Sequence, residues 1–349
     1  MTQSRKRAYG RRIALLSSGP ALFGLTLFLI IPFLMAFALT FTDQRLVATD
    51  SGRFVGWRNY ERLLSISYVV QDPQPGEQGK PAFARVRDVT RADPVHRGFR
   101  PFSDFSWGQK RVTILAKDPV FLESLLNTFG FALMVVPLQC AMALALALLV
   151  NAGLRGQTFL RAVYFSPVVM SMVVVSIVWT FLFDRDLGSI NKLLSLLSLG
   201  TIGPVNWLGD RATAMPAIAL MSAWQGAGFQ MLIFLAGLQG ISQELYDAAR
   251  IDGATAWQRF WNVTIPGLRQ TIAFVLVVTA IAALGLFTQV DVMTQGGPQN
   301  GTSTVMFHAI QRGVREENIA YGSTVAVVYF AIITVLILAQ QALQRRWSK

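Results

Sequence analysis

The stretch from Ser242 to Pro266 reads SQELYDAARIDGATAWQRFWNVTIP. It is polar, and it separates two long runs without charged side chains, at 212–243 and 270–290. Good helix formers fill its first third, and Gly253 interrupts them. The stretch therefore predicts a helix–turn–helix that connects two apolar helices and lies against a membrane surface.

The ends of the two short helices can also be predicted. Ser242 is a suitable N-cap for a first helix over 243–250, and Asp252 can cap the helix that follows. We expect this second helix to end near Val263 and Pro266 to open the next apolar helix. A connector that lies on lipid headgroups and a surface that receives another protein are both compatible with this pattern.

Six uncharged windows are long enough to cross a bilayer, whose hydrocarbon core of about 30 Å needs about 20 apolar residues in a helix. The windows are 13–42, 124–154, 162–183, 212–243, 270–290 and 318–344. Hydrophobic residues make up 53% of the 349 residues and charged residues 14%, whereas soluble domains carry roughly a quarter charged residues. We expect an all-α membrane protein with six transmembrane helices.

Several other classes of function are disfavoured. The net charge of +12 does not indicate nucleic acid, because the basic residues flank the apolar runs instead of forming one face. His96 and His308 lie far apart without ligand-like neighbours, and Cys140 is the single cysteine. We expect no metal site, and no catalytic residues are apparent.

The basic residues of the short segments predict that both termini are cytoplasmic. The expected order is a cytoplasmic tail (1–12), a first transmembrane helix (13–42), an external loop (43–119), a transmembrane domain (121–344) that includes the 242–266 loop, and a cytoplasmic tail (345–349). The first window is too long for a signal peptide and is read as a retained helix.

The external loop contains thirteen Lys or Arg and nine Asp or Glu. Loops longer than about 60 residues cross the membrane largely regardless of charge, so this is compatible with an external position. Residues 71–100 are rich in Pro, Gly and mixed charge, and we expect an irregular, solvated insertion. The short amphipathic segment 191–199 is expected to lie along the outer interface.

The run from Asp247 to Ala254, followed by Phe260 and Ile265-Pro266, resembles the EAA signature of ABC importer permeases. Asp247 stands where that family usually has Glu, so the charge is kept and the reach is one methylene shorter. Five further segments resemble the carbohydrate branch of the family: 56–60, 155–167, 207–210, 236–239 and 294–298. The resemblance covers most of the chain from residue 121, and the insertion at 65–117 has no counterpart in the usual family pattern.

The resemblance implies that the 242–266 loop couples the permease to a cytoplasmic ATPase. The implied coupling residues are Asp247, Ala248, Ala249, Asp252, Gly253, Ala254, Phe260 and Pro266. Gly253 would serve the backbone of the turn, Ala248 and Ala249 a close contact, Asp252 the turn itself, and Phe260 an anchor. The implied partners are a second permease, usually a different chain, two ATPase copies that bind ATP and Mg, and an external binding protein. This chain would bind no cofactor and would not itself be an enzyme.

Polar residues inside the windows are candidates for solute contact, because polar side chains in a span face a cavity or a partner helix. The candidates are Asn127, Gln139, Ser222, Gln225, Gln230, Thr279 and Gln289. By register with maltose-transporter relatives, the resemblance implies a sugar near Ser222, Gln225, Gly226, Phe229 and Thr279. Ordinary interhelical hydrogen bonding is the alternative role for each of them.

The proposed solute is a sugar or a sugar-like molecule, including oligosaccharides, glycosides, polyols and glycerol phosphates. Two other functions remain open on the sequence. An ion-coupled secondary transporter would be expected to show a carboxylate inside a span and an internal repeat. A membrane scaffold without transport activity would not need polar side chains on the two helices that flank the loop.

Overall fold

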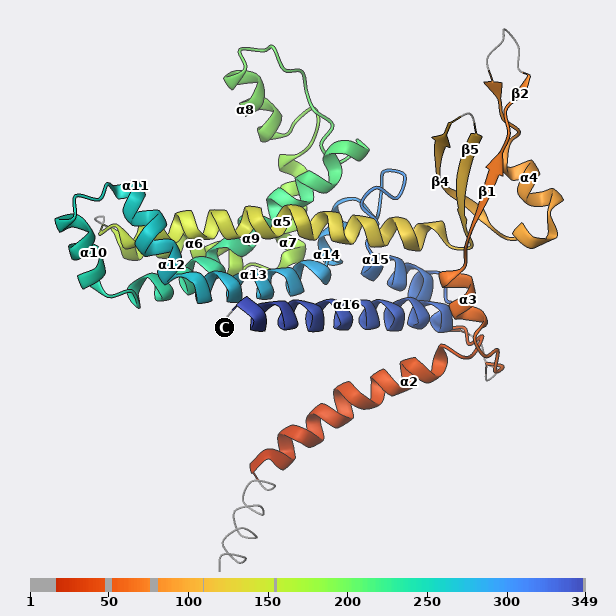
Figure 1. Ribbon diagram of the computed structural model, residues 1–349, viewed down its shortest axis with the longest axis horizontal. Coiled ribbons are helices and arrows are strands. Elements are labelled where there is room, and N and C mark those ends of the chain that lie inside the picture. Colours follow the sequence, from red (N-terminus) through yellow and green to blue (C-terminus); the bar gives the residue numbers. More distant parts are fainter. Residues whose placement is uncertain (1–16, 48–51, 76–80, 109, 154–155, 348–349) are drawn as a thin grey trace, which may run out of the picture. The chain divides into compact units, whose positions relative to one another are not determined.

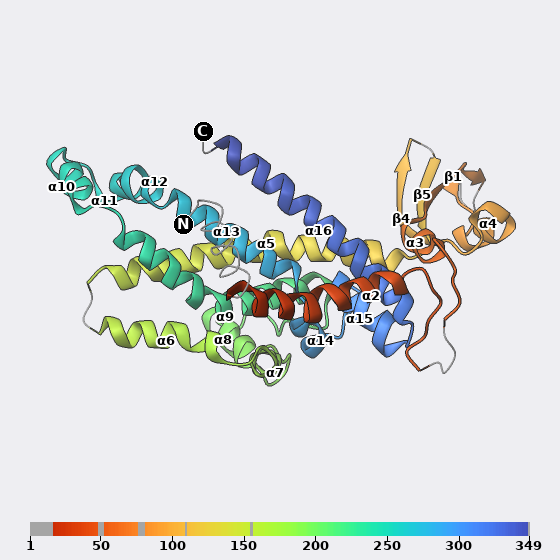
Figure 2. The ribbon, with the colours of Figure 1, turned by 90° about the horizontal axis from the view of Figure 1, so that it is seen from below.

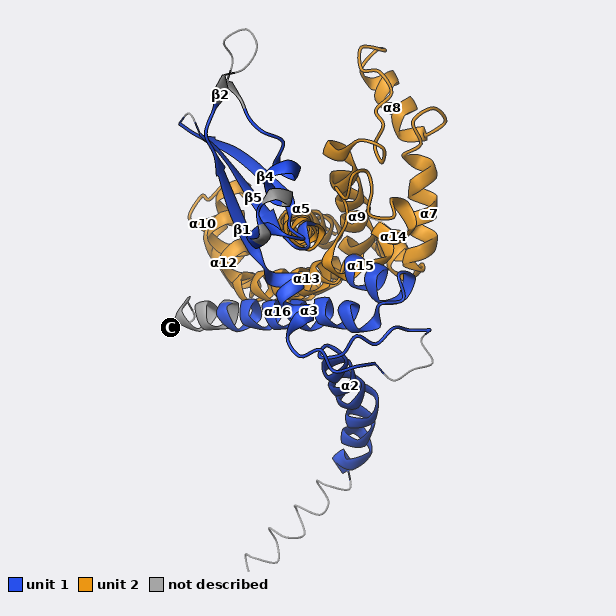
Figure 3. Cartoon of the chain, turned by 90° about the vertical axis from the view of Figure 1, so that its right-hand side faces the viewer, with its two compact units in different colours: residues 1–119, 308–349 blue, residues 120–307 orange. Residues whose placement is uncertain are grey.

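Helices form most of the computed structural model, and the described residues also form a three-stranded and a two-stranded β-sheet (Figures 1 and 2). The structure describes residues 17–47, 52–75, 81–108, 110–153 and 156–347. The chain divides into two compact units, one formed by residues 1–119 with 308–349 and the other by residues 120–307 (Figure 3).

The first unit contains the first and last apolar helices of the chain. Its helical elements outside the insertion are η1 (Thr26–Ile30), α2 (Ile31–Leu39), α3 (Arg58–Leu64), η5 (Gln311–Arg315) and α16 (Ile319–Trp347). Helices α2 and α16 touch through Phe33 and Phe330, whose ring centroids are 5.1 Å apart. Most side chains of the first apolar helix remain exposed, as expected for a helix that faces lipid or another subunit.

The insertion is ordered by a sheet, so the expectation of an irregular segment over 71–100 is wrong in part. Its strands are β1 (Ile66–Gln71), β2 (Gln74–Pro75), β3 (Pro81–Ala82), β4 (Arg100–Trp107) and β5 (Lys110–Ala116), and its helices are α4 (Val86–Ala92) and η3 (Pro94–His96). The main sheet is antiparallel in the order β1-β5-β4. Its register pairs Ile66 with Ala116, so residues that flank the polar stretch join to form the sheet. Strands β2 and β3 form a separate two-stranded sheet, so the fold is mostly helical with two small β-sheets in its described residues.

A buried polar cluster follows the insertion in the first unit. The Tyr321 hydroxyl donates a hydrogen bond of 2.6 Å to Asp118 Oδ2, and His308 Nε2 lies 3.0 Å from the same oxygen. Because all three side chains are buried, these bonds satisfy polar groups that would otherwise be costly in an apolar surrounding. The cluster joins Asp118, which directly precedes α5, to His308 in α15 and to Tyr321 in α16.

The described residues of the second unit form helices and their connections, without a strand. Its elements are α5 (Pro119–Asn151), α6 (Gln157–Val169), α7 (Met172–Leu182), α8 (Ser189–Leu197), α9 (Arg211–Gln239), α10 (Gln243–Ile251), α11 (Ala256–Arg259), η4 (Phe260–Thr264), α12 (Ile265–Gly267), α13 (Arg269–Leu284) and α14 (Thr288–Met293), with α15 (Val305–Ile310) at the boundary between the units. Helix α9 is the most buried of the long apolar helices, and it contacts α6, α7, α13 and α14.

Four helices are long and apolar enough to cross a membrane, and two bent pairs raise the number to six. The single helices are Ser17–Leu39, Pro119–Asn151, Arg211–Gln239 and Ile319–Ala339. The expected straight span at 162–183 is instead α6 and α7, which meet at 99°. Met170 and Ser171 have extended backbone between them, and Pro167 lacks the N–H that a continuous helix would use.

Helix α8 confirms the expected amphipathic segment, with exposed leucines along one side. Its buried Asn191 fixes the connection to α9 from within the second unit. The Asn191 amide donates to the carbonyl of Val205 at 2.9 Å and accepts from Trp207 Nε1 at 2.9 Å. The position of α8 at the outer interface stays a prediction.

Candidate functional site

The 242–266 loop begins with a helix that ends in a glycine turn. The Ser242 hydroxyl accepts a hydrogen bond from the Glu244 N–H at 3.3 Å, which confirms the predicted N-cap of α10. Gly253 has a φ of +77°, a left-handed conformation in which a Cβ is unfavourable. The Ala254 N–H reaches back to the Ala249 carbonyl at 2.9 Å. This is the hydrogen-bond pattern of a helix that terminates at glycine.

Thr255, and not Asp252, caps the second short helix. Its hydroxyl accepts from the Gln258 N–H at 3.3 Å, and the Gln258 side chain accepts from the Thr255 N–H at 2.7 Å. Asp252 is instead the C-cap of the first helix, directly after Ile251, with helical backbone angles. The predicted cap was wrong because Gly253 and Ala254 lie in the turn, so the second helix begins three residues later than the sequence indicated.

The second arm of the loop winds through α11, η4 and α12 before the chain bends. Pro266 lies within α12, and the bend between 256–267 and α13 is 68°. The next apolar helix therefore begins at Arg269 and not at Pro266 as expected. Phe260 packs between two other rings, with centroids 5.9 Å from Trp257 and 5.3 Å from Trp261.

One side-chain hydrogen bond joins the two arms of the loop. The Tyr246 hydroxyl lies 3.0 Å from Thr264 Oγ1. The sequence gives no local signal for this pair, since the two residues are eighteen positions apart. Neither of them is among the positions that resemble the EAA signature. The bond holds the arms together independently of any partner protein.

The loop leaves a mixed surface exposed between the two arms. Asp247 and Ala248 are exposed, and Ala249 and Ala254 are half-buried. Asp247 forms an ion pair of 2.9 Å with Arg250 on the same helix. Ile251 is 87% exposed and Trp257 68% exposed. Small residues beside exposed apolar side chains suit a protein contact, because a partner surface can approach closely and cover them.

A second polar group lies among the apolar helices of the same unit. Gln139 Nε2 on α5 donates to Gln230 Oε1 on α9 at 2.7 Å. Gln230 Nε2 donates in turn to Thr279 Oγ1 on α13 at 3.1 Å. All three side chains are buried. These two hydrogen bonds connect α5, α9 and α13. Thr279 therefore has an interhelical hydrogen bond, which was the alternative to solute contact.

Gly226 makes room for this arrangement. A Cβ built at Gly226 would collide with the side-chain amide of Gln139, so a side chain at position 226 would displace this amide from its bond with Gln230. The sequence marked Gly226 as a solute contact, but it gave no sign that Gln139 fills the space above it.

The remaining three proposed solute residues lie along α9. Ser222 is buried, and its hydroxyl has no hydrogen-bond partner among the described residues. Gln225 is half-buried and donates a long bond of 3.4 Å to the Pro167 carbonyl. Phe229 is 47% exposed. These side chains supply a hydroxyl, an amide and an aromatic face, which are the groups that a sugar needs.

Asn127, another polar candidate from the sequence, anchors a loop of the second unit. Its Nδ2 donates to the carbonyls of Asn300 and Ser303 at 2.8 and 3.0 Å. Within the described part of the chain, no group of His, Cys, Asp and Glu could hold a metal ion.

Comparison with known families gives a match over most of the chain. Residues 119–349 match the family described as "Binding-protein-dependent transport system inner membrane component". The diacetylchitobiose uptake system permease protein of Streptomyces coelicolor is 32% identical over 249 residues, which is 68% of this chain and 70% of that protein. The lactose transport system permease protein of Rhizobium radiobacter is 37% identical over 234 residues, which is 66% of this chain and 78% of that protein.

One solved structure has the same fold along nearly the whole chain. It is a bacterial ABC transporter involved in the import of the acidic polysaccharide alginate, with a TM-score of 0.71 and 18% identity. The alignment covers 99% of this chain and 100% of the other. The likeness therefore includes the region before residue 119, which the family match leaves out.

Proposed function

This chain belongs to the inner-membrane permeases of binding-protein-dependent ABC transporters, and from this premise we propose that it forms half of a pathway for a sugar or sugar-like solute. As a member of this family it is a multi-pass inner-membrane permease subunit, it binds no cofactor, and it is not itself the ATPase. The secondary transporter and the scaffold are set aside by the family membership.

The relatives support a carbohydrate as the solute. Permeases named for diacetylchitobiose, for lactose and for several sugars match this chain at 30–37% identity. On α9, Ser222, Gln225 and Phe229 offer a hydroxyl, an amide and an aromatic face. We assign solute contact to this part of α9. Gly226 and Thr279 would support it from behind, because Gly226 leaves room for Gln139 and Thr279 accepts a hydrogen bond from Gln230.

The proposed assembly places this permease beside a second permease chain, two copies of a cytoplasmic ATPase and an external binding protein. The 242–266 loop would contact the ATPase through Asp247, Ala248, Ala249 and Ala254. Asp252, Gly253 and Phe260 would shape the loop, and Pro266 would lie at its end. In this arrangement both termini are cytoplasmic and the insertion is external, in agreement with the distribution of basic residues in the short segments.

The observation that carries this proposal is the self-supported turn at Gly253 between two apolar helices. The change Gly253→Val forces a β-branched side chain into a left-handed conformation, which costs about 1–3 kcal/mol. In proteoliposomes with the partner subunits, we expect solute uptake to fall about tenfold or more while the variant still inserts and ATP hydrolysis continues.

Gly200→Val is a matched control for this experiment. Gly200 also has a positive φ, of +79°, with no atom close to an added Cβ, and it lies in the connection after α8. It therefore carries the same backbone strain outside the loop. Normal ATP-driven uptake by Gly253→Val, or an equal loss in both variants, would contradict a coupling role for the loop.

A further inference from the structure

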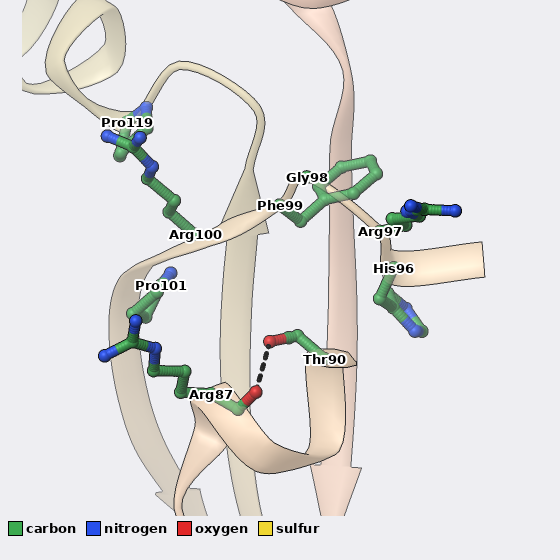
Figure 4. A pocket seen from close by; sticks show the side chains of 9 residues that line it. All are labelled: Arg87, Thr90, His96, Arg97, Gly98, Phe99, Arg100, Pro101 and Pro119. Atoms are coloured by element: carbon green, nitrogen blue, oxygen red, sulfur yellow. Dashed lines mark hydrogen bonds between the residues drawn. The ribbon is translucent and has the colours of Figure 1, made fainter. Parts of the chain in front are cut away.

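The insertion contains a cavity whose walls carry several cationic side chains. Arg87 on α4 and Arg97 and Arg100, which precede and begin β4, line a cavity of about 990 Å³. Figure 4 shows the guanidinium groups of Arg87 beside Pro101 and of Arg100 beside Pro119 on the same side of the view, whereas Arg97 and His96 project on the other side. Two cations from separate elements thus line the same side of the cavity, one near Pro101 and the other near Pro119.

These arginines are not neutralised within the described part of the chain. None of the three has an ion pair there. The nearby Asp93 is already engaged, because it accepts from the Val95 N–H at 2.9 Å and lies 2.8 Å from His96 Nδ1. The Val95 N–H and the His96 side chain lower the pKa of Asp93.

The rest of the wall is neutral and partly apolar. The Thr90 hydroxyl donates to the Arg87 carbonyl within α4 at 3.2 Å. Thr90 brings no negative charge to the cavity. The Phe99 ring and the rings of Pro101 and Pro119 supply apolar surface. The Lys117 ammonium lies 5.5 Å from the centre of the Phe99 ring, which adds another cation at the edge of the cavity.

This combination fits one class of ligand. A guanidinium group binds carboxylate, sulfonate or phosphate oxygens through two parallel hydrogen bonds, and apolar rings suit the C–H faces of a saccharide. The volume lies at the upper end of the range for small-molecule sites, about 300–1,000 Å³, so it exceeds what a bare inorganic ion requires.

We propose that this cavity binds an acidic saccharide, with Arg87 and Arg100 as cations that attract its anionic groups on one side and Phe99 as apolar surface on the other. The site lies outside the residues assigned to the solute pathway on α9. Its place in transport rests on the proposed function, since the insertion must be external to meet the solute. Binding itself depends on the insertion and Pro119 and does not require transport.

Binding can be measured on the full chain in lipid nanodiscs by calorimetry at low salt, with D-glucuronate as the probe and D-glucose as its neutral counterpart. We expect glucuronate to bind and glucose to give no measurable heat. Arg87→Gln and Arg100→Gln should each weaken glucuronate binding about tenfold or more, because a charge-assisted hydrogen-bond pair is lost. Both side chains are exposed, so glutamine should not disturb the sheet.

Arg85→Gln is the matched control. Arg85 is exposed, lies just before α4 and does not line the cavity, so it removes the same charge beside the site. Its glucuronate affinity should stay within about twofold of the unaltered chain, since an exposed charge beside a site acts mainly through screened electrostatics.

Three results would overturn the proposal: no glucuronate binding by the unaltered chain, equal binding of glucose, or an equal loss in Arg85→Gln. A chain that ignores glucuronate but loses binding-protein affinity in Arg87→Gln would mean that the arginines receive acidic side chains of that protein. None of these results involves ATP or the 242–266 loop. A failure here is therefore separate from a failure of the Gly253→Val experiment.

Discussion

The 242–266 loop and the insertion are both polar connections beside apolar helices, yet they are held together in opposite ways. The hydrogen bonds that shape the loop join residues close together in the sequence, and the most widely separated pair is Tyr246 and Thr264. The insertion depends on the pairing of Ile66, near its first residue, with Ala116, near its last residue. The loop can therefore keep its shape while neighbouring helices move, whereas the insertion holds together only if its two ends meet.

The largest expected effect separates the two regions by cutting into the sheet. Leu115 on β5 has no exposed surface, so Leu115→Ala should destabilise the insertion by about 2–5 kcal/mol. Hydrogen exchange followed by mass spectrometry should show faster exchange over β1, β4 and β5, with no change in α10. Val70→Ala on the same sheet is the control, because Val70 is 47% exposed and should cost far less.

If Leu115→Ala also accelerated exchange in α10, the two regions would not be independent. The comparison predicts that they are, because the described hydrogen bonds of the loop come from its own residues. Unchanged exchange throughout would instead mean that the buried side of the sheet contributes little to its stability.

The same difference in range explains what the sequence could and could not predict. The N-cap at Ser242 and the glycine turn at Gly253 follow from neighbouring residues, and both were predicted. The sheet of the insertion was missed because its register depends on residues fifty positions apart, which local patterns do not encode. The cap at Thr255 was missed because Asp252 is also a residue type favoured at N-caps, and only the geometry of the turn excludes it.

The polar groups in the spans follow the same rule. The sequence identified Gln139, Gln230 and Thr279 as polar residues in apolar windows, but it could not show that they bond to one another. That pairing depends on how α5, α9 and α13 face each other. The bend between α6 and α7 was missed for a related reason, since the window 162–183 is uncharged throughout and its Pro167 does not by itself show that the backbone turns extended at Met170 and Ser171.

A smaller effect should come from the cap of the second short helix. Thr255→Ala removes the hydroxyl that accepts from the Gln258 N–H and should destabilise α11 by about 1 kcal/mol. Asp252→Ala should have little effect on the same helix, because Asp252 does not cap it. Exchange rates of the amides at 256–259 measure both. A larger change for Asp252→Ala would restore the cap that the sequence predicted.

The bond between the two arms offers a test of comparable or slightly smaller size. Tyr246→Phe deletes the hydroxyl that meets Thr264 Oγ1 and keeps the ring in place, so it should cost about 0.5–1.5 kcal/mol. We expect faster exchange in both arms and less solute transported per ATP hydrolysed. If exchange rises in one arm only, the bond does not couple them. Thr264→Val should reproduce the effect, since it removes the other partner.

The smallest effect should follow from the exposed ion pair on α10. Both Asp247 and Arg250 are more than half exposed, so solvent screens their attraction, and such pairs contribute little to stability. Arg250→Ala should therefore leave amide exchange in α10 within about twofold of the unaltered chain. If Asp247 contacts the ATPase, Arg250→Ala should change solute uptake although exchange in α10 stays the same. The reason is that removal of Arg250 frees the Asp247 carboxylate for the partner. A change in ATPase binding without a change in exchange would locate the role of the pair at the contact surface, whereas faster exchange in α10 would show that the loop depends on this pair for its fold.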